Sequence, residues 1–108
     1  MSLEVIAIGS DNLVRLDVLT NASSGAYVNT ATVTFTLKDA SGNIFGGQSG
    51  VSMPYVAASN GRYEGDLPQG VTVTMAPGAL FTIEVTAVGG GFTLFRRLSC
   101  IAKYRSNQ

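Results

Sequence analysis

The sequence contains no histidine and no tryptophan, and it has one cysteine, Cys100, among its 108 residues. Without histidine, the chain lacks the most common general base and the most common metal ligand of proteins. With one thiol and no imidazole, a zinc site is close to excluded, an intramolecular disulfide cannot form, and a serine or cysteine nucleophile would lack its usual partner. The composition therefore predicts no catalytic residue, no metal site and no cofactor, and it indicates that the protein is not an enzyme.

Charged residues are also scarce. They make up 13% of the chain, and seven basic and seven acidic side chains give a formal net charge of zero, whereas ordinary soluble domains contain about 25% charged residues. Apolar residues still account for 45%, which favours a folded chain over a disordered one. A surface of Thr, Ser, Asn and Gly is weakly protected against association. We therefore expect protein partners, either further copies of the chain or other subunits.

Long apolar runs are absent as well. No stretch approaches the ~18 residues of a membrane-spanning helix, and residues 1–17 lack the basic and apolar regions of a secretory signal. The sequence thus predicts no membrane contact, and synthesis in the cytoplasm without a signal peptide. Its length fits one domain, which we expect at residues 1–104, with residues 105–108 as a frayed tail.

Helical periodicity is lacking, and alternation with a period of two takes its place. In residues 31–38, Val33, Phe35 and Leu37 alternate with threonines, and residues 79–88 repeat this scheme, which is typical of half-buried strands. Turn signals recur at the spacing of about 8–12 residues expected of sandwiches and barrels. The strands between them are predicted at 3–8, 12–19, 31–38, 44–53, 61–66, 71–75, 79–88 and 91–104. Two alternatives stay open: the first strand continues into the second, or residues 71–75 form a loop.

These strands predict an all-β fold. Seven to eight short strands in one domain favour an immunoglobulin-like antiparallel β-sandwich, with a small β-barrel as the alternative. The Cys–Trp–Cys signature of antibody domains is absent, because the chain has no tryptophan and one cysteine. Cys100 alternates with apolar neighbours, and we expect it to be a small buried hydrophobe.

The densest side-chain chemistry lies in residues 59–70, where Arg62, Glu64 and Asp66 alternate around Tyr63. Two carboxylates at positions i and i+2 of a strand lie about 6.6 Å apart along the backbone, which overlaps the separation of about 6.5–9.5 Å in inverting glycosidases. Every alternating strand produces this spacing, however. We interpret the three charged residues as a solvent face with a cationic neighbour across the sheet, and Tyr63 as an inward anchor.

Residues 39–43, Asp-Ala-Ser-Gly-Asn, resemble the opening of a calcium-binding loop. The EF-hand pattern requires glycine at its sixth position and glutamate at its twelfth, where this chain has Ile44 and Gly50. The segment is instead predicted to be a hairpin turn, in which Asp39 bonds the local backbone and Gly42 supplies a positive φ.

Basic residues gather near the C-terminus, together with Phe92, Phe95 and Tyr104. Cations beside aromatic rings can bind single-stranded nucleic acid, but nucleic-acid domains are usually distinctly basic, and this chain is neutral. A protein interface, where arginine and aromatic residues are enriched, is the better interpretation. In a regular strand Arg96 and Arg97 point to opposite faces. The candidate partner-binding residues are Tyr55, Tyr63, Arg96, Arg97, Lys103 and Arg105.

A second candidate surface is the apolar segment 50–59, which includes Val51, Met53, Tyr55 and Val56. Pro54 interrupts it and marks an edge strand or a loop. The segment forms either an exposed patch for association or part of the core, and the sequence leaves both alternatives open.

Several sequence segments resemble those of small proteins encoded in tailed phages and prophages. They are Asp-Asn-x-Val-Arg-Leu at 11–16, Ala-x-Val-x-Phe-x-Leu-Lys-Asp-Ala-x-Gly at 31–42, Gly-x-Tyr-x-Gly-x-Leu-Pro at 61–68, and the closing strand pair. The resemblance implies an immunoglobulin-like module and a structural role in a virion or its assembly, as head decoration, connector or tail component. Its partners would be copies of itself or other virion subunits. The alternative is a carbohydrate- or nucleic-acid-binding β-sandwich module.

Overall fold

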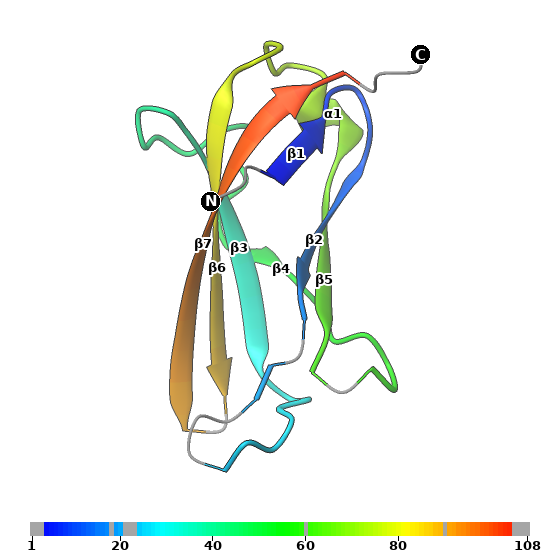
Figure 1. Cartoon of the computed structure of the whole chain (residues 1–108), viewed down its shortest axis with the longest axis vertical. Helices are drawn as coiled ribbons and strands as arrows, with labels where there is room; N and C mark the ends of the chain where they lie inside the picture. The colour runs from blue at the N-terminus through cyan, green and yellow to red at the C-terminus, as the bar shows by residue number, and fades with distance from the viewer. Residues whose placement is uncertain (1–3, 18, 21–23, 60, 90, 105–108) are drawn as a thin grey trace.

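The computed structural model describes residues 4–17, 19–20, 24–59, 61–89 and 91–104, and nearly all of its regular structure is β-strand (Figure 1). The elements are β1 (Glu4–Ala7), β2 (Asn12–Leu16), β3 (Thr32–Asp39), β4 (Val51–Ser52), β5 (Tyr63–Leu67), α1 (Gln69–Thr72), β6 (Leu80–Gly89) and β7 (Phe92–Lys103). The predicted all-β class is confirmed. The expected frayed tail, residues 105–108, lies outside the described residues. None of the described residues belongs to a helix long and apolar enough to cross a membrane.

The strands form two unequal layers. A five-stranded sheet has the order β1-β7-β6-β3-β4, and a two-stranded sheet pairs β2 with β5. The large sheet curls at its upper end so that β7 and β1 reach toward the smaller sheet (Figure 1). The arrangement is therefore a curled sheet that faces a narrow one, rather than an even pair of layers.

The expectation of a wholly antiparallel sandwich was wrong, because β1 runs parallel to β7, with Glu4 opposite Cys100. A tight turn separates β1 from β2 and sends the two strands to different sheets. The side chain of Asn12 closes this turn by accepting a hydrogen bond from Ala7 N (2.9 Å) and donating to Ala7 O (3.1 Å). β2 continues into the small sheet, whereas β1 pairs with β7, the last strand of the large sheet along the sequence.

The core lies between the two sheets and is built from the inward side of each alternating strand. Tyr63 is 1% exposed, and its hydroxyl donates to Val28 O (2.7 Å) and accepts from Ala31 N (3.1 Å), so the predicted inward anchor is confirmed. The largest fully buried side chains are Tyr63, Phe35, Leu16, Leu37, Met53, Leu67, Val85, Thr72 and Cys100.

Two predicted strands were wrong for different reasons. Within 44–53 only Val51 and Ser52 form a strand beside β3, and Ile44 makes an isolated bridge to Lys38. Gly46, Gly47 and Gly50 all adopt positive φ (62°, 71° and 61°) and break the extended backbone between them.

Residues 69–72 form α1 where a strand over 71–75 was expected. Hydrogen bonds to the β1–β2 turn fix this segment: Gln69 N donates to Asp11 Oδ1 (2.6 Å), and Thr72 Oγ1 donates to Ser10 O (2.7 Å). Tertiary contacts thus override the local alternation, as is common for β-propensity. The alternative of an irregular segment at 71–75 was closer to the structure.

Candidate interaction surface

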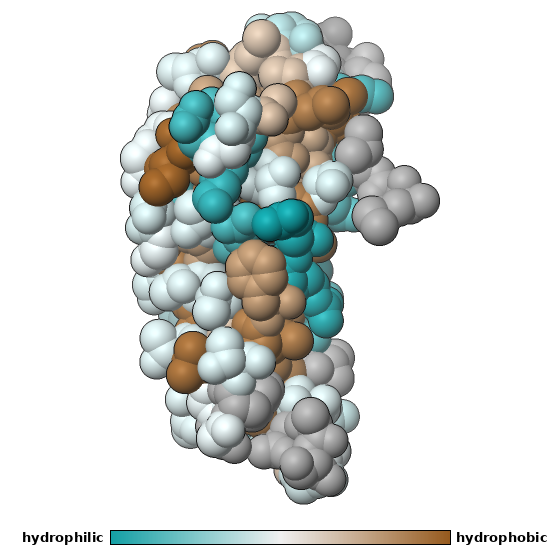
Figure 2. Space-filling view, turned by 90° about the vertical axis from the view of Figure 1, so that its left-hand side faces the viewer, coloured by the Kyte–Doolittle hydropathy of each residue, from teal (hydrophilic) through white to brown (hydrophobic). Residues whose placement is uncertain are grey.

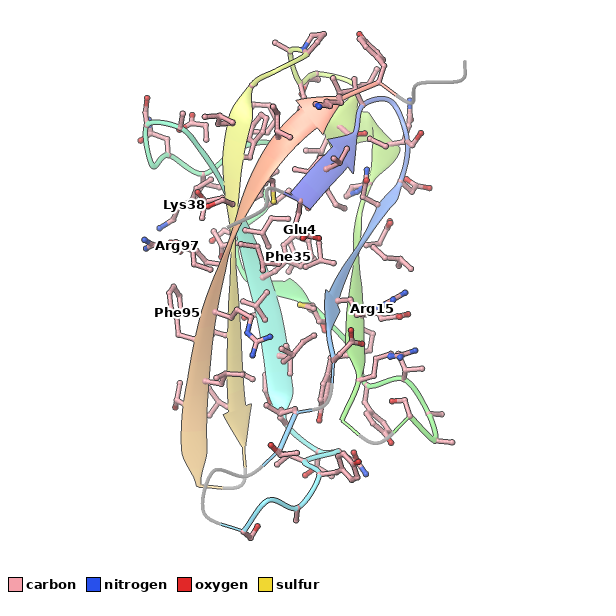
Figure 3. All side chains as sticks on the ribbon, viewed as in Figure 1. Glu4, Arg15, Phe35, Lys38, Phe95 and Arg97 are labelled. Carbon is pink, nitrogen blue, oxygen red and sulfur yellow. The ribbon has the colours of Figure 1, made fainter. Side chains whose placement is uncertain are left out.

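The outward side of the small sheet is a row of ion pairs. Arg15 Nε lies 2.9 Å from Glu64 Oε2, directly across the ladder, and Arg62 Nε lies 3.0 Å from Asp17 Oδ1. The predicted solvent face with a cationic neighbour is confirmed. The carboxylate of Glu64 is engaged by Arg15, which points away from the large sheet (Figure 3).

The two tyrosines among the candidate contacts occupy different environments. Tyr63 is fully buried and both of its hydroxyl bonds are internal, so it does not belong to the accessible surface and this candidate is corrected. Tyr55 is half-buried and its ring packs against the ring of Tyr63, with centroids 5.6 Å apart. Tyr55 therefore stays a candidate contact, while Tyr63 supports it from within.

The C-terminal cations that the structure describes do not form one patch. The β6–β7 register runs unbroken, with Arg97 opposite Glu84 and Arg96 opposite buried Val85, so the two arginines point to opposite faces as predicted. Lys103 lies at the other end of β7, opposite Ala7, and Arg105 lies outside the described residues. Within the described residues, Arg96, Arg97 and Lys103 therefore do not form one basic stripe.

Arg97 is part of a charged network on the outward side of the large sheet. Glu84 lies between Lys38 Nζ (3.0 Å) and Arg97 Nη2 (3.1 Å), and the Arg97 guanidinium lies 5.9 Å from the Phe95 ring centroid. The hydrogen bond from Lys38 is the largest influence that lowers the pKa of Glu84, with further contributions from the charge of Lys38 and from Arg97, while desolvation opposes them. Figure 3 shows Lys38, Phe95 and Arg97 on the same side of the sheet.

This side of the large sheet, which we call the outer face, was missed by sequence reasoning. Alternation identifies the outward residues of each strand but not which strands lie side by side. The register places them in cross-strand rows across β3, β6 and β7. The rows are Thr32–Val88–Thr93, Thr34–Thr86–Phe95, Thr36–Glu84–Arg97 and Lys38–Thr82–Ser99. The repeated threonines of residues 32–36 were the available signal.

The outer face is weakly polar over most of its area. Figure 2 looks onto it and shows pale, weakly polar residues beside one strongly hydrophilic band and scattered hydrophobic residues. Phe95 is 54% exposed and Val88 is 50% exposed. Charge on this face is confined to the network of Lys38, Glu84 and Arg97, so losing water from the rest of the face costs less than it would for a surface of unpaired charges.

A groove of about 480 Å³ separates the edge of β2 from β1 and β7. Its apolar lining consists of Val5, Ile6, Leu13, Val14, Leu67, Ile83, Leu98 and Cys100. Cys100 is buried, as predicted, and desolvation is the main cause that raises the pKa of its thiol to about 11. The thiol therefore stays protonated at neutral pH and is a poor nucleophile.

The segment 50–59 combines both alternatives that the sequence left open. Met53 is buried, while Val51, Tyr55 and Val56 are half-buried beside an open hollow near Glu64 and Asp66. The segment is thus partly core and partly surface.

The predicted turn at 39–43 is confirmed. Asp39 Oδ1 accepts hydrogen bonds from Ser41 N (2.9 Å) and Asn43 N (3.0 Å), and Gly42 has φ of 86°. The Asp39 side chain therefore stabilises the turn by bonding its backbone. Among the described residues, no three or more Cys, Asp or Glu side chains gather in a way that could hold a metal ion.

Comparison with known proteins gives no relative. No protein-family model matches the chain, and neither curated proteins nor solved structures yield a significant match.

Proposed function

We propose that this chain is a non-catalytic interaction module with an immunoglobulin-like strand order, and that it serves as a structural subunit or assembly accessory of a phage or prophage particle. In this proposal the protein acts through its surface, as head decoration, connector or tail component. The resemblance of residues 11–16, 31–42 and 61–68 to phage proteins supplies the setting.

The strand order supports the immunoglobulin-like part of the proposal. In immunoglobulin domains strands C, F and G share one sheet, B and E share the other, and variable-type domains add a further strand beside C. Here β3, β6 and β7 form the first group, β2 and β5 form the second, and β4 lies beside β3. The chain departs from the constant-type pattern in its parallel β1 and in its narrow second sheet.

The outer face is the observation that carries the functional part. It combines long, regular strands with threonine side chains, an exposed aromatic ring and one confined charged network. Interfaces favour arginine and aromatic residues and are poor in other charges at their centre. The smaller sheet, by contrast, exposes two separate ion pairs, which favour hydration.

Co-fractionation with assembled particles tests the proposal. The chain is expressed with the products of its neighbouring genes, and particles are separated on a density gradient. Thr86 lies between Thr34 and Phe95 at the middle of the outer face, so Thr86→Lys should remove the chain from the particle fraction. Asp66→Asn, on the exposed side of the small sheet, is the matched control and should stay with the particles.

A chain that neither self-associates nor enters the particle fraction would overturn the proposal. The alternative, a carbohydrate- or nucleic-acid-binding module, is tested by titration with a glycan panel and with single-stranded DNA at low and high salt. Binding to DNA that weakens steeply with salt, or saturable binding to a glycan, would replace the structural role.

A further inference from the structure

In the part of the chain that the structure describes, one edge of β7 has no strand partner over more than half of its length, and we call it the bare edge. β7 spans Phe92–Lys103, and β6 pairs with it from Phe92 to Ile101. On the opposite edge, β1 pairs only with residues 100–103. Among the described residues, no strand therefore pairs with the outer edge of residues 92–99. A regular strand edge of this length exposes backbone donors and acceptors in the geometry that another strand requires.

Two hydrogen bonds identify which backbone groups face that edge. Lys103 O accepts from Ile8 N, on the β1 side, whereas Ala102 N donates to Ala79 O, on the β6 side. The N–H and C=O of one residue point to the same edge of a strand, and successive residues alternate. Because the pairing with β6 is unbroken, Thr93, Phe95 and Arg97 present their N–H and C=O groups to the bare edge.

We propose that the bare edge of β7 pairs with the same edge of a second copy, antiparallel and about a two-fold axis at Phe95. This inference rests on the proposed function, since it names one partner of a protein that works through its surface. The two large sheets would join into one continuous sheet, and their outer faces would lie on the same side. About six backbone hydrogen bonds would form, two for each of three paired residues.

Charge disfavours two neighbouring registers. An axis at Arg96 or at Arg97 would place a guanidinium directly opposite its own copy, and like charges at such positions are destabilising. An axis at Phe95 sets Arg97 opposite Thr93 of the second copy and Arg96 opposite Leu94 of the second copy. The two Phe95 rings then lie next to each other on the outer face, where aromatic cross-strand pairs stabilise a sheet.

The length of the bare edge agrees with the same register. With the axis at Phe95, the second copy's β7 begins opposite Leu98, and β1 begins opposite Cys100. The incoming strand would therefore occupy the stretch that β1 leaves open. At the other end of the large sheet β4 has two residues, too few to continue such pairing, so the assembly closes as a dimer and does not grow into a fibre.

Engineered cysteines test the register. In Phe95→Cys the two new thiols would face each other with Cα atoms about 5.5 Å apart, within the range of a disulfide, and oxidation should cross-link most of the dimer. Thr93→Cys is the matched control: its thiol would face Arg97 of the second copy, about four residues from its own counterpart, and should not cross-link. Native Cys100 is buried, so it should not compete with the engineered thiols.

Sedimentation velocity from about 1 to about 200 μM tests the dimer itself. The wild-type chain should dimerise, and Phe95→Asp, which sets two carboxylates opposite each other on an exposed position, should raise the dissociation constant about tenfold or more. Far-UV circular dichroism verifies that the variant is folded. A wild-type chain that stays monomeric, or cross-linking of Thr93→Cys as readily as Phe95→Cys, would overturn the edge pairing. Either result leaves co-fractionation with particles as a separate measurement.

Discussion

The two sheets of this protein are held in opposite ways. The large sheet is held by its own ladders, since β6 is paired along both edges. The small sheet has two short strands, and it is joined to the rest of the molecule by its buried side chains, Val14, Leu16, Tyr63 and Leu67, and by the hydrogen bond from the Tyr63 hydroxyl to Val28 O. Their outward sides differ as well, because the small sheet carries separate ion pairs and the large one a single network among threonines. The outward side of one layer is thus more highly charged than that of the other.

The largest expected loss of stability comes from adding a methyl group at Gly65, where the two layers pack closely. A Cβ at Gly65 would lie 2.8 Å from Met53 Cγ and 3.1 Å from Phe35 Cε2, so Gly65→Ala should lower the free energy of unfolding by about 1–3 kcal/mol. Gly70→Ala is the control, because nothing lies within 4 Å of its Cβ position. Urea denaturation measures both, and equal stabilities would contradict the close approach of β5 to the large sheet.

The Tyr63 hydroxyl connects the small sheet to the segment that precedes β3. Tyr63→Phe removes the hydroxyl that bonds Val28 O and Ala31 N, and we expect the free energy of unfolding to fall by about 1–2 kcal/mol in thermal or urea unfolding. Tyr27→Phe, at a 53% exposed position, should change stability little. Should both variants unfold alike, the hydroxyl would not be a link.

The charged network and the separate ion pairs can be compared directly. Glu84→Gln weakens two contacts, to Lys38 and Arg97, and should cost from a few tenths to about 1 kcal/mol. Glu64→Gln weakens the single contact to Arg15 and should cost less than about 0.5 kcal/mol. Urea midpoints measured side by side give the order, and a larger loss at Glu64 would reverse the comparison.

Acid should reveal the same difference with the smallest amplitude. The pKa of Glu84 is lowered from its ordinary value of 4.5, mainly by the hydrogen bond from Lys38. A lowered pKa means that Glu84 contributes its full stabilisation above pH 4.5 and loses it as the pH falls through the lowered value. Between neutral pH and about pH 3, the free energy of unfolding should therefore fall less steeply in Glu84→Gln than in the wild type. Identical slopes would remove Glu84 from the acid response.

Strands with strict alternation could be predicted from the sequence almost to the residue. Residues 31–38 were expected where β3 covers Thr32–Asp39, and 79–88 where β6 covers Leu80–Gly89. Alternation records which side of a strand is buried, so it also gave the inward position of Tyr63 and the opposite directions of Arg96 and Arg97.

Features that depend on distant contacts could not be predicted. The alternation of residues 71–75 is overridden by hydrogen bonds from α1 to Ser10 and Asp11, which lie far away in the sequence. The outer face and the bare edge of β7 depend on strand order, and the parallel pairing of β1 depends on a partner at the other end of the chain. No local pattern encodes these neighbours.

The pairing of Glu4–Ala7 with Cys100–Lys103 also governs when the sheet can be completed. Of the described strands, β1 is synthesised first and its partner β7 is synthesised last. Ile6 and Ile8, both buried in the folded protein, therefore lack their complete native surroundings until β7 is made. Contacts between segments so distant in sequence slow folding, and exposed apolar segments in unfinished chains are prone to aggregate. The first of these strands to be synthesised is thus among the last to reach its native pairing.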